Sequence, residues 1–172
     1  MLAFYLCFWS QVINQTLYLL KINRLDLLEK SFGEVLIPYS VYEELTIDKR
    51  FMAEAKIVKD ASYIKSVLVS NPEAVRILKM ATGLDQGESE AIVLTDERKA
   101  DILLMDEAKG RTISGQMGIT IMGTIGLLIS AYEDKLITAE EARKCIDNLQ
   151  ASGRHIGERH YRMLLDKLRQ KR

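Results

Sequence analysis

Cysteine, proline and histidine are scarce in this sequence, and neither sign of charge dominates it. Only two residues of each of these types occur among 172, and 24 Lys and Arg balance 24 Asp and Glu. The two cysteines, Cys7 and Cys145, lie far apart, which excludes a disulfide scaffold and predicts a reducing, cytoplasmic location. The zero net charge excludes a global attraction to nucleic acid, so RNA binding would need a local patch or a metal ion.

A long uninterrupted apolar run is also missing. Residues 1–13 are rich in apolar and aromatic side chains, but polar residues interrupt this segment from Ser10 onward, and the first basic residue is Lys21. A signal peptide would begin with positive charge, and a membrane helix needs about 20 apolar residues. We therefore predict a buried strand that leads into a helix, and no membrane insertion.

Short, mostly apolar segments alternate with longer amphipathic ones along the chain. The clearest apolar segments are residues 35–37, 102–105 and 119–122, and residues 63–69 indicate an edge strand or an extended connector. Apolar runs of this length are typical of parallel strands that are covered on both faces. Their alternation with helices predicts an α/β fold, namely a three-layer α/β/α arrangement with a central parallel sheet.

Capping residues indicate where several helices begin. Ser40, Asp85 and Thr138 each precede a Glu by three residues, which is the spacing of a capping box. The predicted helices cover residues 16–30, 40–45, 48–62, 73–81, 86–99 and 125–136, one from residue 138 onward, and 155–172.

Three acidic residues are predicted to meet at one edge of the sheet. Asp106 follows the strand that ends at Met105, and Glu88 lies in the first turn of the preceding helix. Glu44 lies on the helix after residues 35–37. Ligands of an open parallel sheet gather outside the carboxyl ends of its strands. Because packed carboxylates repel one another, this arrangement favours Mg²⁺ or Mn²⁺, which would activate a water molecule for attack on a phosphodiester.

Each acid also has a purely structural interpretation. Glu43 and Asp85 fit helix caps, and Glu88 would stabilise its helix by roughly 0.3–1 kcal/mol through the helix dipole. Asp106 fits a cap of the helix that follows it. Position in the sequence alone does not decide between these interpretations and a metal site.

Several motifs, in a fixed order, resemble those of a known family. They are GLDQGESEAI at residues 83–92, ADILLMDE at 100–107, LIP at 36–38, VYEEL at 41–45 and GTIGLL at 123–128. They are similar to the LDxGExEAI helix, the LLxD(D/E) strand end and the GTxGxL helix start of the PIN-domain superfamily, in its prokaryotic toxin-type (VapC-like) branch. The resemblance covers about Leu17 to Leu165.

This resemblance implies metal-dependent hydrolysis of RNA by a PIN-like fold. By position, Glu44, Glu88 and Asp106 would be the catalytic acids and would bind Mg²⁺ or Mn²⁺. The resemblance further implies the toxin half of a toxin–antitoxin pair, with an antitoxin protein as partner and a homodimer as the common state.

Three charged residues lie close in sequence to these acids. The resemblance places Arg111 where it would contact a phosphate of the RNA, and it makes Glu107 a neighbour of the site. Glu90 is two residues beyond Glu88, so we expect its side chain to point away from the acidic cluster.

The sequence departs from the family at its start. A PIN domain carries an Asp at the end of its first strand, whereas no acid precedes Asp26 here, and Asn14 is the nearest candidate ligand. An Asn side chain offers a metal one carbonyl oxygen but no charge. Two functions therefore stay open: a metal-dependent endoribonuclease, and a catalytically degenerate PIN-like protein that is only a binding module or a decaying gene product.

The C-terminal segment is basic. We divide the chain into a PIN-like domain with an atypical first strand over residues 1–150 and a basic helix over residues 151–172, packed on that domain or trailing from it. Lys and Arg outnumber Glu158 and Asp166 in this segment. A basic helix can steer RNA through phosphate contacts, or it can simply be solvated.

Overall fold

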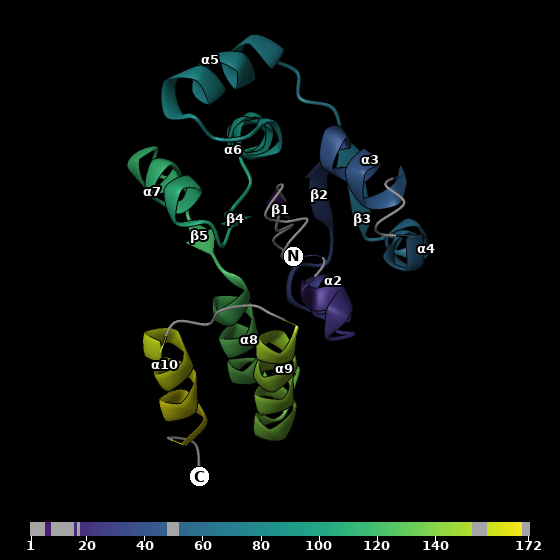
Figure 1. Ribbon diagram of the computed structural model, residues 1–172, viewed down its shortest axis with the longest axis vertical. Helices are drawn as coiled ribbons and strands as arrows, with labels where there is room; N and C mark the ends of the chain where they lie inside the picture. The colour runs from purple at the N-terminus through teal and green to yellow at the C-terminus, as the bar shows by residue number, and fades with distance from the viewer. Residues whose placement is uncertain (1–5, 8–15, 17, 48–51, 153–157, 170–172) are drawn as a thin grey trace.

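The chain has a mixed α/β fold in which helices dominate and the strands are short and parallel (Figure 1). The computed structural model describes residues 6–7, 16, 18–47, 52–152 and 158–169. The strands are β1 (Leu6–Cys7), β2 (Val35–Pro38), β3 (Ile64–Val67), β4 (Ile102–Leu104) and β5 (Ile121–Met122). The helices are α2 (Asp26–Phe32), α3 (Tyr39–Ile47), α4 (Met52–Asp60), α5 (Pro72–Thr82), α6 (Gln86–Arg98), α7 (Ala108–Gln116), α8 (Thr124–Glu133), α9 (Ala139–Ala151) and α10 (Glu158–Arg169).

The strand pairings among the described residues are all parallel, in the order β3-β2-β1-β4-β5. β2 pairs with β3 along its whole length, and β4 pairs with β5. Among the described residues, the pair Cys7↔Leu36 joins β1 to β2. The predicted central sheet is therefore only partly realised, because it consists of two parallel pairs joined through a strand of two residues.

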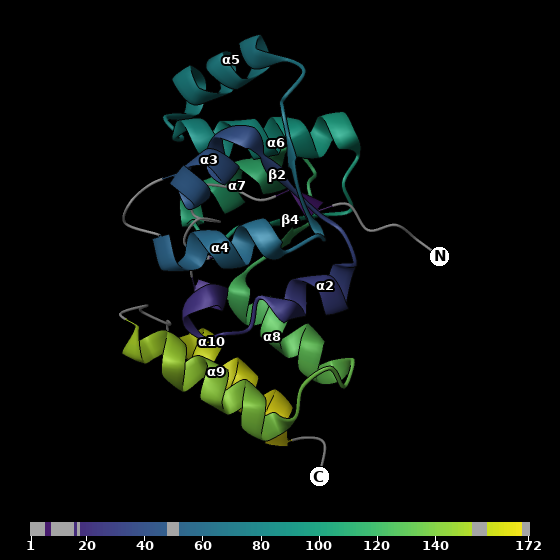
Figure 2. The same ribbon diagram turned by 90° about the vertical axis from the view of Figure 1, so that its right-hand side faces the viewer.

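Helices lie on both sides of these strands. α6 packs against β1, β2 and β4, and α5 covers the outer face of α6. Figures 1 and 2 show α2, α8, α9 and α10 on the opposite side of the strands. The core between these groups is made of apolar side chains with almost no exposed area, among them Leu27, Leu28, Ile92, Leu94, Leu103 and Leu104.

Most predicted strands and several helices occur close to their expected positions, but the helix predicted over residues 16–30 is wrong. The structure has a helical turn up to Lys21 and a new helix, α2, that begins at Asp26. Asn23 between them has a φ of 54°, a left-handed conformation that Asn tolerates better than most residues. The break allows Ile22 and Leu25 to reach the core.

Two of the three predicted capping boxes are confirmed. Asp85 with Glu88, and Thr138 with Glu141, form reciprocal hydrogen bonds at the starts of α6 and α9. The predicted box at Ser40 is wrong, because α3 begins at Tyr39 directly after β2 and Ser40 is already inside the helix.

The C-terminal helix packs on the rest of the fold. Lys167 Nζ lies 2.6 Å from Glu133 Oε1 of α8, and the Leu168 side chain is buried. Residues 153–157 and 170–172 of the predicted segment lie outside the described residues. None of the described helices has both the length and the apolar character that crossing a bilayer requires.

The core position of Leu103 gives a stability prediction. Leu103 is fully buried in β4, so Leu103→Ala should lower the free energy of unfolding by about 2–5 kcal/mol, through lost burial and a residual cavity. Leu68→Ala is the control, because 72% of Leu68 is exposed and its truncation should cost less than about 0.5 kcal/mol. Urea denaturation measures both, and equal losses would contradict the described packing.

Candidate functional site

The residues after β4 and β5 face each other at the carboxyl edge of the strands. β4 is followed by Met105 and Asp106, and β5 is followed by Gly123 and Thr124. Leu104 pairs with Met122, and the Met105 N–H donates to the Met122 carbonyl at 2.8 Å. Two residues beyond this pair on each segment, the Asp106 side chain contacts Thr124.

The Asp106 carboxylate is held by both donors of Thr124. Oδ1 accepts a hydrogen bond from the Thr124 backbone N–H at 3.0 Å, and Oδ2 accepts one from the Thr124 hydroxyl at 2.6 Å. The alternative that Asp106 caps the following helix, α7, is therefore wrong, since the N-cap residue of α7 is Glu107. Asp106 instead binds the first residue of α8, which is the helix after β5.

Arg111 lies beside Asp106. Its Nη1 donates to the Met105 carbonyl at 2.7 Å, which ties the guanidinium to the end of β4. A Cβ atom added to Gly123 would lie 2.7 Å from Asp106 Oδ1 and 3.3 Å from Arg111 Nη1. Only glycine at this position leaves room for both charged groups where they lie.

Glu88 is buried at the start of α6, with 6% of its area exposed. Its Oε2 accepts a hydrogen bond from the Asp85 N–H at 3.0 Å, as a capping box requires. Its Oε1 is buried and accepts no hydrogen bond from the part of the chain that the structure describes. Burial raises the pKa of Glu88, and the negative charges of Asp85 and Glu107 raise it further.

The starts of α6 and α7 are brought together beside this orphaned oxygen. Lys109 Nζ of α7 donates to the carbonyl of Gly83, just before α6, at 3.0 Å. Glu107 and Lys109 are both close enough to Glu88 for their charges to affect its pKa, in opposite directions. The charge of Glu107 is thus part of the electrostatic surroundings of Glu88, and its place beside a metal site stays a prediction.

Glu44 and Glu90 lie on two helices, α3 and α6, that a hydrogen bond joins. Glu44 is exposed on α3. One turn earlier on that helix, Ser40 donates its hydroxyl to Glu90 Oε2 at 2.5 Å, and Glu90 Oε1 accepts from Gln86 at 2.7 Å. Glu90 thus points toward the helix that carries Glu44. No local pattern indicates this contact, because it joins residues 50 positions apart.

The structure does not group the described carboxylates into a metal site. Within the described ranges, no three His, Cys, Asp or Glu residues are grouped closely enough to hold a metal ion. Asn14, the candidate for the missing first-strand ligand, lies outside these ranges. The orphaned Glu88 oxygen next to a second carboxylate nevertheless fits a hard cation, since Mg²⁺ and Mn²⁺ bind carboxylate oxygens and keep several waters.

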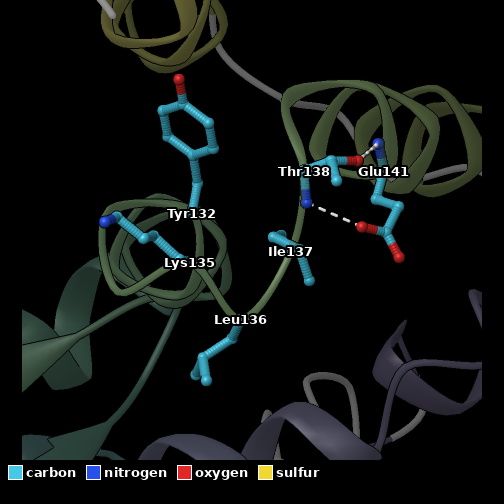
Figure 3. Close-up of a pocket in the computed structure, with 6 residues that line it drawn as sticks. All are labelled: Tyr132, Lys135, Leu136, Ile137, Thr138 and Glu141. Atoms are coloured by element: carbon cyan, nitrogen blue, oxygen red, sulfur yellow. Dashed lines mark hydrogen bonds between the residues drawn. The ribbon is translucent and has the colours of Figure 1, made fainter.

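A pocket of about 390 Å³ lies elsewhere, at the turn between α8 and α9 (Figure 3). It is at the far end of α8 from Thr124, roughly 15 Å away by helix rise. Its polar lining residues Thr138 and Glu141 bind each other in the capping box of α9. This pocket is therefore separate from the acidic residues.

Comparison with known proteins gives one match. The family model DUF3368, described as a PIN domain, matches residues 12–170 of the chain. No curated protein and no solved structure matches it significantly.

The two capping-box glutamates should respond to pH in opposite directions. The folded state raises the pKa of Glu88, so the stability linked to its protonation is complete below its unfolded pKa of about 4.3 and is lost as the pH rises through the folded value. Glu88→Gln keeps the acceptor for Asp85 and removes the charge. Its stability relative to the original chain should therefore increase as the pH rises from about 4 to 7.

Glu141 is the matched control, because the Thr138 N–H lowers its pKa. Its stabilising effect is present above the unfolded pKa and is lost as the pH falls through the lowered folded value, so Glu141→Gln should lose relative stability as the pH rises. Denaturation in EDTA over the same pH range measures both variants. Parallel pH dependences would show that the burial of Glu88 does not govern its ionisation.

Proposed function

This chain belongs to the PIN-domain family, whose fold is nuclease-like, and on this premise we propose that it is a divalent-metal-dependent endoribonuclease of toxin–antitoxin type. The observation that supports this most directly is the buried Glu88 oxygen without a hydrogen-bond partner in the described part of the chain. A buried carboxylate oxygen is costly unless a proton or a cation meets it. The negative charge of Glu107 also acts on Glu88, so a cation at this oxygen would be stabilised.

In this proposal Glu88 and Asp106 hold Mg²⁺ or Mn²⁺, and Glu44 reaches the ion from α3. Glu44 lies one turn after Ser40, whose hydroxyl joins α3 to Glu90 of α6, the helix that also carries Glu88. Asn14 is the candidate for a fourth oxygen. The bound metal would supply an activated water and stabilise charge on the phosphodiester.

Arg111 is the proposed phosphate contact. Its anchoring to the Met105 carbonyl orients the guanidinium at the strand edge beside Asp106, where the RNA backbone would pass the acids. A guanidinium also presents donors in a fork that matches phosphate oxygens. The cytoplasmic location, an antitoxin partner and a homodimer belong to the same proposal, and they rest on the motifs and on the scarcity of cysteine.

A second candidate function is a catalytically degenerate PIN-like module that only binds a partner. Two observations favour it: no acid precedes Asp26 in the sequence, and the described residues contain no ready group of three metal ligands. Metal binding separates the two candidates, because a ligand that binds only the native state must raise the melting temperature.

The endoribonuclease proposal predicts that Asp106→Asn abolishes both metal binding and RNA cleavage. Mn²⁺ should raise the melting temperature of the original chain but not that of the variant. Cleavage of RNA should fall by more than about 100-fold, because losing even an outer partner of a metal ligand typically costs 10–100-fold.

Asp101→Asn is the control, since Asp101 is an exposed acid at the opposite end of the same strand, β4. It should keep both the Mn²⁺ response and the cleavage. No melting shift with millimolar Mn²⁺ in the original chain would support the degenerate module, and cleavage that survives in Asp106→Asn would show that the site lies elsewhere.

A further inference from the structure

The start of α8 is unusual because its cap comes from another strand. The N-cap residue is Gly123, which has no side chain to accept a hydrogen bond. The first N–H of the helix, that of Thr124, donates instead to Asp106, 18 residues earlier. The hydroxyl of the same residue donates to the other oxygen of that carboxylate. One residue therefore fixes both oxygens.

We propose that Thr124 is a positioning residue that holds the Asp106 carboxylate in the orientation in which it receives a divalent cation. This inference rests on the proposed function, because it concerns the same metal site. Thr124 would contact neither the metal nor the RNA. Its contribution would be to orient the Asp106 carboxylate.

The hydroxyl of Thr124 is suited to this role. Thr124 is 2% exposed, so its hydroxyl is shielded from water and its hydrogen bond to Oδ2 is short, at 2.6 Å. A β-branched side chain has few χ1 rotamers, which restricts where the hydroxyl can point.

Gly123 provides the space that this orientation needs. A Cβ at Gly123 would lie 2.7 Å from Oδ1, which is closer than a carbon and an oxygen can approach without displacement. The φ of Gly123 is −99°, which any residue adopts, so backbone freedom does not explain a glycine here. The position instead needs a residue without a side chain, because the carboxylate of Asp106 occupies that volume.

A purely structural role makes a different prediction. If Asp106 served only to cap α8, losing the Thr124 hydroxyl would lower stability and leave metal affinity unchanged. If the hydroxyl positions a ligand, its loss must change metal affinity in protein that is fully folded. Conserving the hydroxyl should then restore that affinity.

The experiment compares Thr124→Val, which keeps the shape and the backbone N–H but loses the hydroxyl, with Thr124→Ser, which keeps the hydroxyl. The dissociation constant of Mn²⁺ is measured by calorimetry on folded protein, and melting temperatures are measured in EDTA. Thr124→Val should weaken Mn²⁺ binding by about 10–100-fold, and Thr124→Ser should restore it to within about threefold.

Two further variants make the result decisive. Thr138→Val removes a hydroxyl that caps α9, so it should lower the melting temperature without changing Mn²⁺ affinity. Gly123→Ala displaces the carboxylate while keeping the Thr124 hydroxyl, so it should weaken Mn²⁺ binding even if Thr124→Val does not fold.

The outcomes separate this inference from the proposed function. Suppose that the original chain binds Mn²⁺ and that Thr124→Val, or Gly123→Ala if Thr124→Val does not fold, binds it equally well. Thr124 then does not position the ligand, but the metal site itself still stands. If the original chain does not bind Mn²⁺, the metal site and its positioning residue are both wrong. Weakened binding in Thr124→Val with recovery in Thr124→Ser supports both.

Discussion

The parallel pairing of β4 with β5 is the constraint on which the candidate site depends. The register of this pairing, Leu103↔Ile121 and Leu104↔Met122, brings Asp106 within hydrogen-bond distance of Thr124. A shift of one residue would turn the Asp106 side chain to the other face of the strand. The backbone hydrogen bonds from Leu103 to Thr120 and from Met105 to Met122 hold this register. Backbone pairing between β4 and β5 thus orients the acid.

Much of the fold and part of the site can be predicted from the sequence, wherever the signal is local. The runs around Leu36 and Leu103 indicate buried strands, and the spacing of Asp85 and Glu88 indicates a cap, because each pattern is confined to a few neighbouring residues. The break at Asn23 could not be predicted in this way, because apolar residues continue through it at the spacing of a helix. Tertiary burial of Ile22 and Leu25 decides the conformation there.

The parts of the site that the sequence did not predict involve contacts between distant segments. Ser40 has the spacing of a cap, but its hydroxyl binds Glu90 on another helix. Asp106 precedes α7, yet it binds the start of α8. In both cases a polar side chain next to a helix start has two possible partners, and only the assembled fold determines which partner lies within reach. The motifs indicate which acids are candidates, but the contacts that orient them come from the assembled fold.

Two of the local departures from ordinary protein design lie at helix starts that involve proposed ligands. Glu88 satisfies its capping box with one oxygen and leaves the other buried without a hydrogen-bond partner among the described residues. Gly123 has no side chain to cap α8, so the Thr124 N–H at the start of this helix donates to Asp106 instead. Selection for stability alone would favour an amide side chain in place of Glu88. In place of Gly123 it would favour Ser or Asp, which are better caps. Both replacements would remove what a cation needs, namely a charged acceptor in one case and the space for a carboxylate in the other. The locally unfavourable choices are therefore consistent with each other once they are considered as parts of one binding site.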